Sequence, residues 1–193
     1  MMDAMAQGKS LRRRVGLAAA GLTLAAAVAL LMADPRLRRA VALSRTEREG
    51  DLLFQKGDLA GAEACWRPVL AARPLAESAR NKLAVVCIQQ DRFEEARALL
   101  DDGIRRQPSV TSYHFNLGLL RHMEGDPAGA LQALARVEAL NPGHGDLHYL
   151  KGLAYERLGE SGKANAEFVK QLNVDPATPR AWARLGVTGM AVR

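Results

Sequence analysis

Proline recurs at a fixed interval in this sequence, and that interval limits the fold more than any other feature. Four of the eight prolines, Pro74, Pro108, Pro142 and Pro176, follow one another in steps of 34 residues. A fixed period of this length is typical of arrays in which one small structural unit is stacked many times. The sequence therefore predicts a repeat protein.

Other residue types keep the same 34-residue step. The series are Gly50, Ala84, Gly118, Gly152 and Gly186; Ala62, Ala96, Ala130 and Ala164; Gly57, Asp91, Gly125 and Gly159; and Trp66, Leu100, Leu134 and Phe168. Small residues let two helices approach closely, glycine permits a tight turn, and proline cannot continue a helix. We expect each unit to be a pair of antiparallel helices in which Gly118 and Ala130 meet. Asp126 and Pro127 are typical of the N-cap and first residue of a helix.

Two stretches carry a resemblance to a known family: YHFNLGLLRHMEGDPAGALQALARVEALNP and YLKGLAYERLGESGKANAEFVKQLNVDP. Their pattern is similar to that of the tetratricopeptide repeat (TPR) family. The resemblance implies an all-α solenoid of helical hairpins, with a last helix that caps the array. The implied units are 43–76, 77–110, 111–144 and 145–178, and the capping helix is 179–193.

The sequence departs from the family pattern at two places. The position that usually holds tyrosine is occupied by Leu53, Cys87 and Arg121, and only the fourth unit keeps the aromatic residue, Tyr155. Pro68 lies inside the second helix of the first unit, where we expect it to kink or shorten that helix.

An apolar stretch precedes the repeats. Residues 15–33 contain no charged side chain, and 19 residues of helix span roughly 28 Å, which is close to the hydrocarbon thickness of a bilayer. The stretch predicts a single transmembrane helix that acts as a signal anchor; a cleaved signal peptide is the alternative. A basic tail, 1–14, and a basic juxtamembrane linker, 34–42, flank it.

The net charge of +6 is confined to residues 1–14 and 34–48, which flank the apolar stretch and carry +3 each. Residues 49–193 carry 18 basic and 18 acidic side chains, so the repeats are neutral. This distribution indicates attraction to anionic lipid head groups and argues against nucleic-acid binding. The basic cluster before Val15 favours a cytoplasmic N-terminus and a periplasmic repeat domain on a bacterial inner membrane.

Sequence motifs of enzymes are missing, including GxxxxGK[ST], GxSxG and HExxH. We expect neither catalysis nor a small-molecule substrate, a cofactor or a bound metal. His114 and His148 occupy the usual tryptophan position of the family, which indicates packing between helices. His144 and His148 lie four residues apart, but no third metal ligand is evident. Cys65 and Cys87 match no metal-binding spacing and are interpreted as core residues.

The family resemblance also implies a protein-binding groove, which the first helix of each unit lines. In some TPR proteins, lysine and asparagine at several groove positions grip acidic peptide tails, whereas here Asn81 stands alone among Glu47, Asp51, Val85, Phe115 and Tyr149. The predicted groove residues are Phe54, Val85, Ile88, Phe115, Leu119, His122, Met123, Tyr149 and Leu153. They suit an apolar segment or an amphipathic helix.

The function that this sequence predicts is a membrane-anchored scaffold that binds partner proteins during assembly of an envelope complex. The alternative is a structural protein that forms homo-oligomers or tethers membranes without a specific client.

Overall fold

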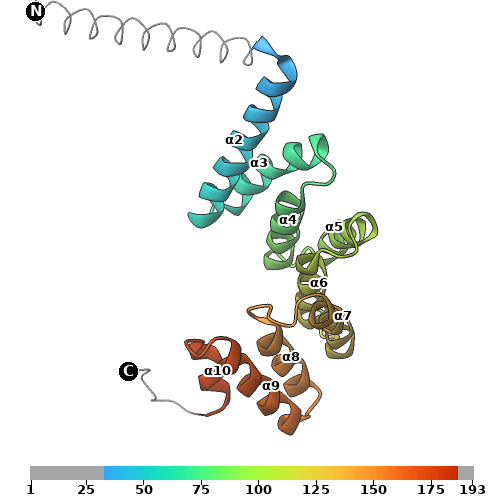
Figure 1. The fold of residues 1–193 in the computed structure, drawn as a ribbon, viewed down its shortest axis with the longest axis vertical. Helices are drawn as coiled ribbons and strands as arrows, with labels where there is room; N and C mark the ends of the chain where they lie inside the picture. The colour runs from blue at the N-terminus through green and yellow to red at the C-terminus, as the bar shows by residue number, and fades with distance from the viewer. Residues whose placement is uncertain (1–32, 187–193) are drawn as a thin grey trace, which may run out of the picture. The chain divides into compact units, whose positions relative to one another are not determined.

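The computed structural model describes residues 33–186, and within that range all regular secondary structure is helical. The helices are α2 (Pro35–Gln55), α3 (Leu59–Ala72), α4 (Glu77–Gln89), α5 (Phe93–Arg106), α6 (Thr111–Met123), α7 (Pro127–Leu140), α8 (Leu147–Arg157), α9 (Ser161–Val174) and α10 (Pro179–Arg184). The chain divides into two compact units, Met1–Glu49 and Gly50–Arg193, and α3 to α10 belong to the second. Figure 1 shows the helices in chain order.

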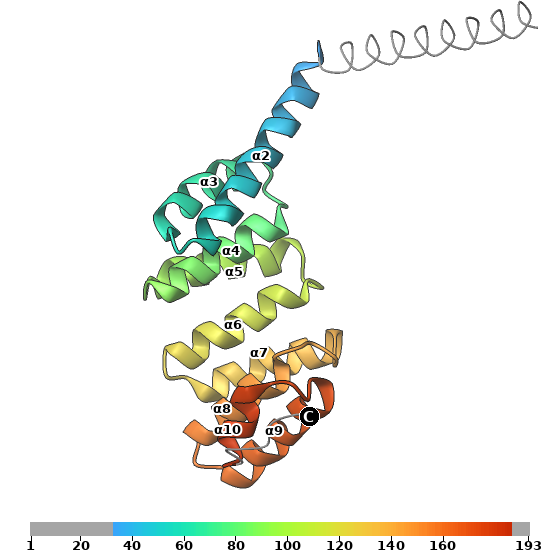
Figure 2. The same ribbon diagram turned by 90° about the vertical axis from the view of Figure 1, so that its left-hand side faces the viewer.

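The second unit is a stack of helical hairpins. The most extensive helix contacts join α4 to α5, α6 to α7, and α8 to α9, and successive hairpins meet through α5 and α6 and through α7 and α8. The first helices of these hairpins, α4, α6 and α8, also contact one another in sequence. Figure 2 shows α4 to α9 following one another down the stack. The prediction of an all-α solenoid of the TPR type is confirmed.

The recurring prolines set where the second helix of each hairpin ends. The helices α3, α5, α7 and α9 each end two residues before a proline of the series. Proline disfavours the helical conformation of the residue before it. The intervening cap residues accordingly leave the helical region, as Gln107 does with ψ of 73°.

The turn between paired helices needs a residue with positive φ. Gly125 has φ of 82°, and Asp91 takes the same left-handed conformation in the second hairpin with φ of 57°. Asp126 then caps α7, because its side chain accepts a hydrogen bond of 2.8 Å from the backbone N–H of Gly129, and Pro127 is the first helical residue. The sequence predictions for this turn are confirmed.

Where paired helices cross, a small residue on one helix faces a large side chain on the other. A Cβ added to Gly118 would lie 2.9 Å from Leu134 Cγ and 3.5 Å from the carbonyl oxygen of Ala130. Gly50 faces Trp66 and Gly152 faces Phe168 in the same manner. The predicted close approach at Gly118 is therefore present, and Leu134 fills it together with the backbone at Ala130.

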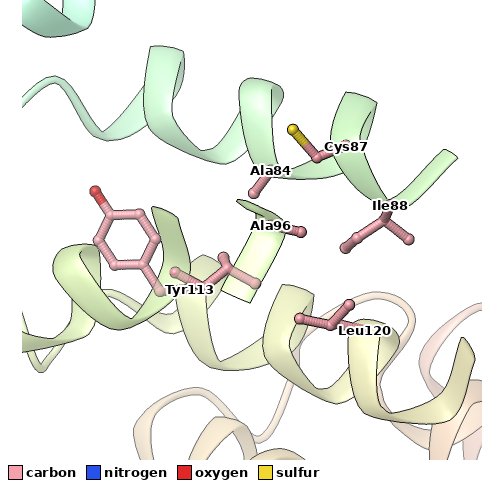
Figure 3. Close-up of a cluster of buried hydrophobic side chains, with 7 residues drawn as sticks. Ala84, Cys87, Ile88, Ala96, Tyr113 and Leu120 are labelled. Carbon is pink, nitrogen blue, oxygen red and sulfur yellow. The ribbon is translucent and has the colours of Figure 1, made fainter. Parts of the chain in front are cut away.

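The core is continuous between hairpins. Between α4, α5 and α6, a cluster of buried side chains includes Cys87, Tyr113 and Leu120, each of which is fully buried (Figure 3). Desolvation in this cluster raises the pKa of the Cys87 thiol. Within residues 33–186, neither Cys87 nor the half-buried Cys65 forms a disulfide, which agrees with their interpretation as packing residues.

The structure differs from the predictions at the start of the repeats. Residues 35–42 were predicted as a linker, but they belong to α2, which has 21 residues where α4, α6 and α8 have 13, 13 and 11. Pro35 is the first residue of this helix, a position at which the fixed φ of proline and its missing N–H are tolerated. Residues 35–42 of the predicted linker are therefore helical.

Pro68 does not shorten its helix. The helix α3 has 14 residues, as α5, α7 and α9 do. Pro68 and Ala64 are both exposed, so the carbonyl of Ala64, which loses its helical N–H partner, is open to water. Of the two predicted effects of Pro68, a kink or a shortened helix, shortening does not occur.

No helix within residues 33–186 is long and apolar enough to cross a bilayer. The predicted membrane segment, 15–33, lies outside the described residues except for Ala33, and the basic tail, 1–14, lies outside them entirely. The capping helix predicted at 179–193 is described as far as Gly186, and its helical part, α10, has six residues.

Candidate functional site

A hollow of about 320 Å³ lies between α6, α8 and α10. Its walls are mostly apolar side chains from successive hairpins. They are Phe115, Leu119, His122, Met123, Asp146, Tyr149, Leu150, Leu153 and Arg180. We call this hollow the groove.

Helical spacing explains why these side chains converge. Phe115, Leu119 and His122 are four and three residues apart, so they share one face of α6. Tyr149 and Leu153 repeat the first two positions one unit later on α8, and α6 contacts α8 directly. Repetition of one helical face in neighbouring units therefore builds a continuous apolar floor.

Aromatic and charged side chains lie at one end of the groove. The His144 ring stacks on Phe115 with ring centroids 4.3 Å apart. The guanidinium of Arg180 lies 4.6 Å from the centre of the Tyr149 ring and forms an ion pair with Asp146. The ion pair links α10 to the residue before α8, so the lone terminal helix completes this wall.

Histidine and arginine form the opposite end. Arg157 donates a hydrogen bond of 2.9 Å to the carbonyl oxygen of His122, the penultimate residue of α6. Burial, together with the positive charges of Arg157 and Arg184, lowers the pKa of His122. The lowered pKa favours the neutral imidazole of His122 in the floor of the groove.

The groove unites some of the predicted site residues and leaves others out. Those that line it are Phe115, Leu119, His122, Met123, Tyr149 and Leu153. Ile88 is only 3% exposed and belongs to the core between α4 and α6. Phe54 packs against Trp66 with ring centroids 5.7 Å apart, and Val85 is half-buried outside the groove.

The equivalent surface of α4 is polar and internally bonded. Asn81 donates to the hydroxyl of Ser112 at 2.8 Å and accepts from the Asn116 amide at 3.0 Å, while Ser112 donates to Glu77 at 2.8 Å. These hydrogen bonds satisfy the groups that could otherwise grip a peptide backbone. The apolar groove is thus confined to the C-terminal hairpins.

Three lining residues were absent from the predicted set. Leu150 immediately follows Tyr149 and reaches the groove from the turn of α8 that also contributes to the core. Asp146 and Arg180 occupy the same repeat position one period apart. Extending the 34-residue register into the terminal helix was the signal that could have identified Arg180.

His144 and His148 make separate contacts. His144 turns toward Phe115, whereas His148 Nδ1 lies 2.7 Å from Glu167 Oε2 in a buried contact that includes Lys151. Within residues 33–186 no group of three or more potential metal ligands is present.

Comparison with known proteins assigns the fold to a family. Two tetratricopeptide repeat models match, one at residues 47–110 and 88–144 and the other at 121–185. The chain belongs to the tetratricopeptide repeat family. TPR units in general bind other proteins.

Individual relatives share the repeats. The mouse FK506-binding protein-like is 31% identical over 146 residues, which are 75% of this chain and 35% of that protein. Mouse tetratricopeptide repeat protein 16 is 33% identical over 100 residues, 48% of this chain and 13% of that protein. The chain therefore spans about a third or less of the length of these relatives.

Solved TPR structures cover the same region. A crystal structure of MamA is 28% identical, covers 72% of this chain and 81% of its own, and superposes with a TM-score of 0.60. The thermophilic TPR protein TTC0263 of Thermus thermophilus is 22% identical, covers 75% of this chain and 84% of its own, and has a TM-score of 0.66. The second likeness concerns the fold alone.

The TPR position that usually holds tryptophan is occupied here by side chains that bond to a neighbouring part of the chain. Arg80, His114 and Trp182 stand there, and a side-chain nitrogen of each lies 2.6 to 2.9 Å from the carbonyl oxygen of the proline six residues earlier. His148 bonds Glu167 instead. His114 and His148 are both 8% exposed, as expected for side chains that pack between helices.

Proposed function

We propose that this TPR protein is a membrane-anchored scaffold whose groove binds an apolar segment of a partner protein during assembly of an envelope complex. The groove between α6, α8 and α10 carries the proposal. Its hollow is lined by two aromatic rings, several aliphatic side chains and a methionine, and its nearby charges are largely paired.

The groove favours a particular kind of client. Met123 is 46% exposed although it is a large apolar side chain. Exposed methionine is flexible and polarizable, and adapts to apolar partners of different shapes. An amphipathic helix or an apolar extended segment would cover Met123, Phe115 and Leu153 together.

A pair of matched substitutions tests this assignment. Met123→Glu places a carboxylate in the groove, and Leu158→Glu makes the same change at a side chain of similar exposure, 42%, that does not line it. The full chain is purified from cells of its own source, and the co-purifying proteins are quantified. A bound client would bury Met123, so loss of its apolar side chain and burial of a charge in its place should reduce specific capture about tenfold or more.

The two variants make the outcome decisive. Leu158→Glu should capture the same partners as the unaltered chain, and both variants should keep their far-UV helicity. Equal capture by Met123→Glu and the unaltered chain would remove the groove as the client site.

We also propose that residues 15–33 anchor the chain in the inner membrane, with the N-terminus in the cytoplasm and the repeats in the periplasm. The 19-residue uncharged stretch and the preceding basic cluster support this topology. Alkaline phosphatase and a fluorescent protein that folds only in the cytoplasm are fused after Arg193 in separate chains. Phosphatase activity without fluorescence is expected, and the reverse result would contradict the orientation.

A further inference from the structure

Residues 35–48 of α2 form an arginine-rich helical segment. Residues 34–48 contain five arginines against the carboxylates of Asp34 and Glu47. Because residues 35–48 are helical, spacings of seven and three place Arg38, Arg45 and Arg48 on one face. All three are exposed.

These arginines differ from the basic residues of the repeats in their pairing. Most arginines and lysines between residues 50 and 186 form ion pairs, as Arg92 does with Glu63 and Arg97 with Glu124. Among the described residues, no ion pair joins a carboxylate to Arg36, Arg38, Arg39, Arg45 or Arg48. Glu49, one turn after Arg45, forms no ion pair with it. Residues 34–48 therefore carry a net charge of +3.

A hollow of about 450 Å³ accompanies the charged face. It is lined by Ala40, Val41, Ser44, Arg45 and Arg48. Arginine recognises phosphate through two parallel N–H donors. The Ser44 hydroxyl donates to the carbonyl of Ala40 at 3.0 Å and retains its acceptor capacity. Two guanidinium groups beside a partly apolar hollow suit a phosphate that is attached to a hydrophobic molecule.

We infer that the face of α2 formed by Arg38, Arg45 and Arg48 binds the phosphate head groups of anionic phospholipids. The uncharged stretch 15–33 ends immediately before α2, which favours a lipid source for the phosphate. Residues 34–48 contain no aromatic side chain on which a nucleic-acid base could stack. The inference does not depend on the protein-binding groove.

Selective lipid retention tests the inference. The full chain is purified from nonionic detergent micelles that contain equal amounts of phosphatidylglycerol and phosphatidylcholine, and the ratio of the two lipids that remain bound is measured. The test variant carries Arg38→Gln, Arg45→Gln and Arg48→Gln. The control carries Arg105→Gln, Arg106→Gln and Arg136→Gln, which removes the same charge from exposed positions of the repeats.

The unaltered chain and the control should both enrich phosphatidylglycerol. The α2 variant should lose at least about fivefold of that enrichment, which is the factor that a single arginine contributes at an anionic surface. Enrichment should also fall when the salt concentration is raised from about 0.1 M to about 1 M, because exposed charges are screened.

Three results would overturn the inference. One is equal enrichment by the α2 variant and the control, since the retained lipid would then be bound elsewhere. Another is displacement of the phosphatidylglycerol by inorganic phosphate at the same phosphate concentration, which would assign the site to a free anion. The third is displacement by duplex DNA at that concentration, which would assign it to nucleic acid.

Discussion

The close approach of Gly152 to Phe168 makes a substitution that usually stabilises a helix harmful here. In an ordinary helix interior, replacing glycine by alanine stabilises the helix by about 1 kcal/mol. At Gly152 the added Cβ would lie 2.4 Å from Phe168 Cε1, whereas ordinary contacts are 3.4–4 Å. The ring must therefore retreat by about 1 Å, and it is fully buried.

Overpacking of this kind costs about 1 to 3 kcal/mol. Set against the helix propensity of alanine, Gly152→Ala should lower the free energy of unfolding by up to about 2 kcal/mol. For an array of this length the melting temperature should fall by roughly 2 to 4 °C for each kcal/mol. Thermal and urea unfolding followed by circular dichroism at the helix band measure both quantities.

Two further variants make the reasoning refutable. Gly162 lies in α9 with nothing within 4 Å of its added Cβ, so Gly162→Ala should stabilise the chain. The second hairpin already combines Ala84 with Leu100, so adding Phe168→Leu to Gly152→Ala should recover part of the loss. Equal or greater stability of Gly152→Ala alone would show that the helices do not approach as closely as described.

Three other substitutions test separate features of the fold. Asp91→Gly should raise the free energy of unfolding by up to about 1 kcal/mol in urea titrations, because Asp91 holds φ of 57° where the other turns have glycine. Hydrogen bonding to Arg92 is the main cause that lowers the pKa of Glu63 from 4.5 to about 2. The ionised carboxylate therefore stabilises the fold above pH 4.5, and this contribution is lost as the pH falls toward 2. The stability advantage of the unaltered chain over Glu63→Gln should shrink across that window in pH-dependent unfolding. Pro68→Ala should raise the melting temperature, because the new N–H can donate to the Ala64 carbonyl in a helix where interior proline costs about 3 kcal/mol.

The helical hairpins could be predicted from the sequence because the start and end of each helix depend on residues close to them in the chain. Pro108 and Pro142 end helices through steric exclusion, and Gly125 and Asp126 form a turn and a cap from their own backbone and side chain. These effects act within a few residues, so a fixed period reveals them without any knowledge of the tertiary contacts.

The groove was only partly predictable because identical repeat positions meet different neighbours. Ile88 and His122 occupy the same position of consecutive units. Ile88 is buried against Leu120 and its neighbours in the core, whereas His122 lines the groove. Periodicity predicts which face of a helix a residue lies on. It does not predict how far the next hairpin buries that residue.

The length of α2 was missed for a different reason. The charge of the arginines in residues 34–42 indicates a segment beside a membrane, whereas the helix start depends on Pro35 as its first residue. Charge composition and helix formation are compatible, since arginine is a strong helix former.

Photo-crosslinking from within the groove tests the central claim most directly. A photoreactive amino acid is placed at Met123 in one full-length chain and at the exposed Arg136 of α7 in another, and both are irradiated in cells of the source organism. The proposed function predicts covalent adducts with specific partner proteins from position 123 and none of these from position 136. Adducts with the same partners from position 136 alone, or equally from both positions, would contradict the assignment of the groove as the binding site.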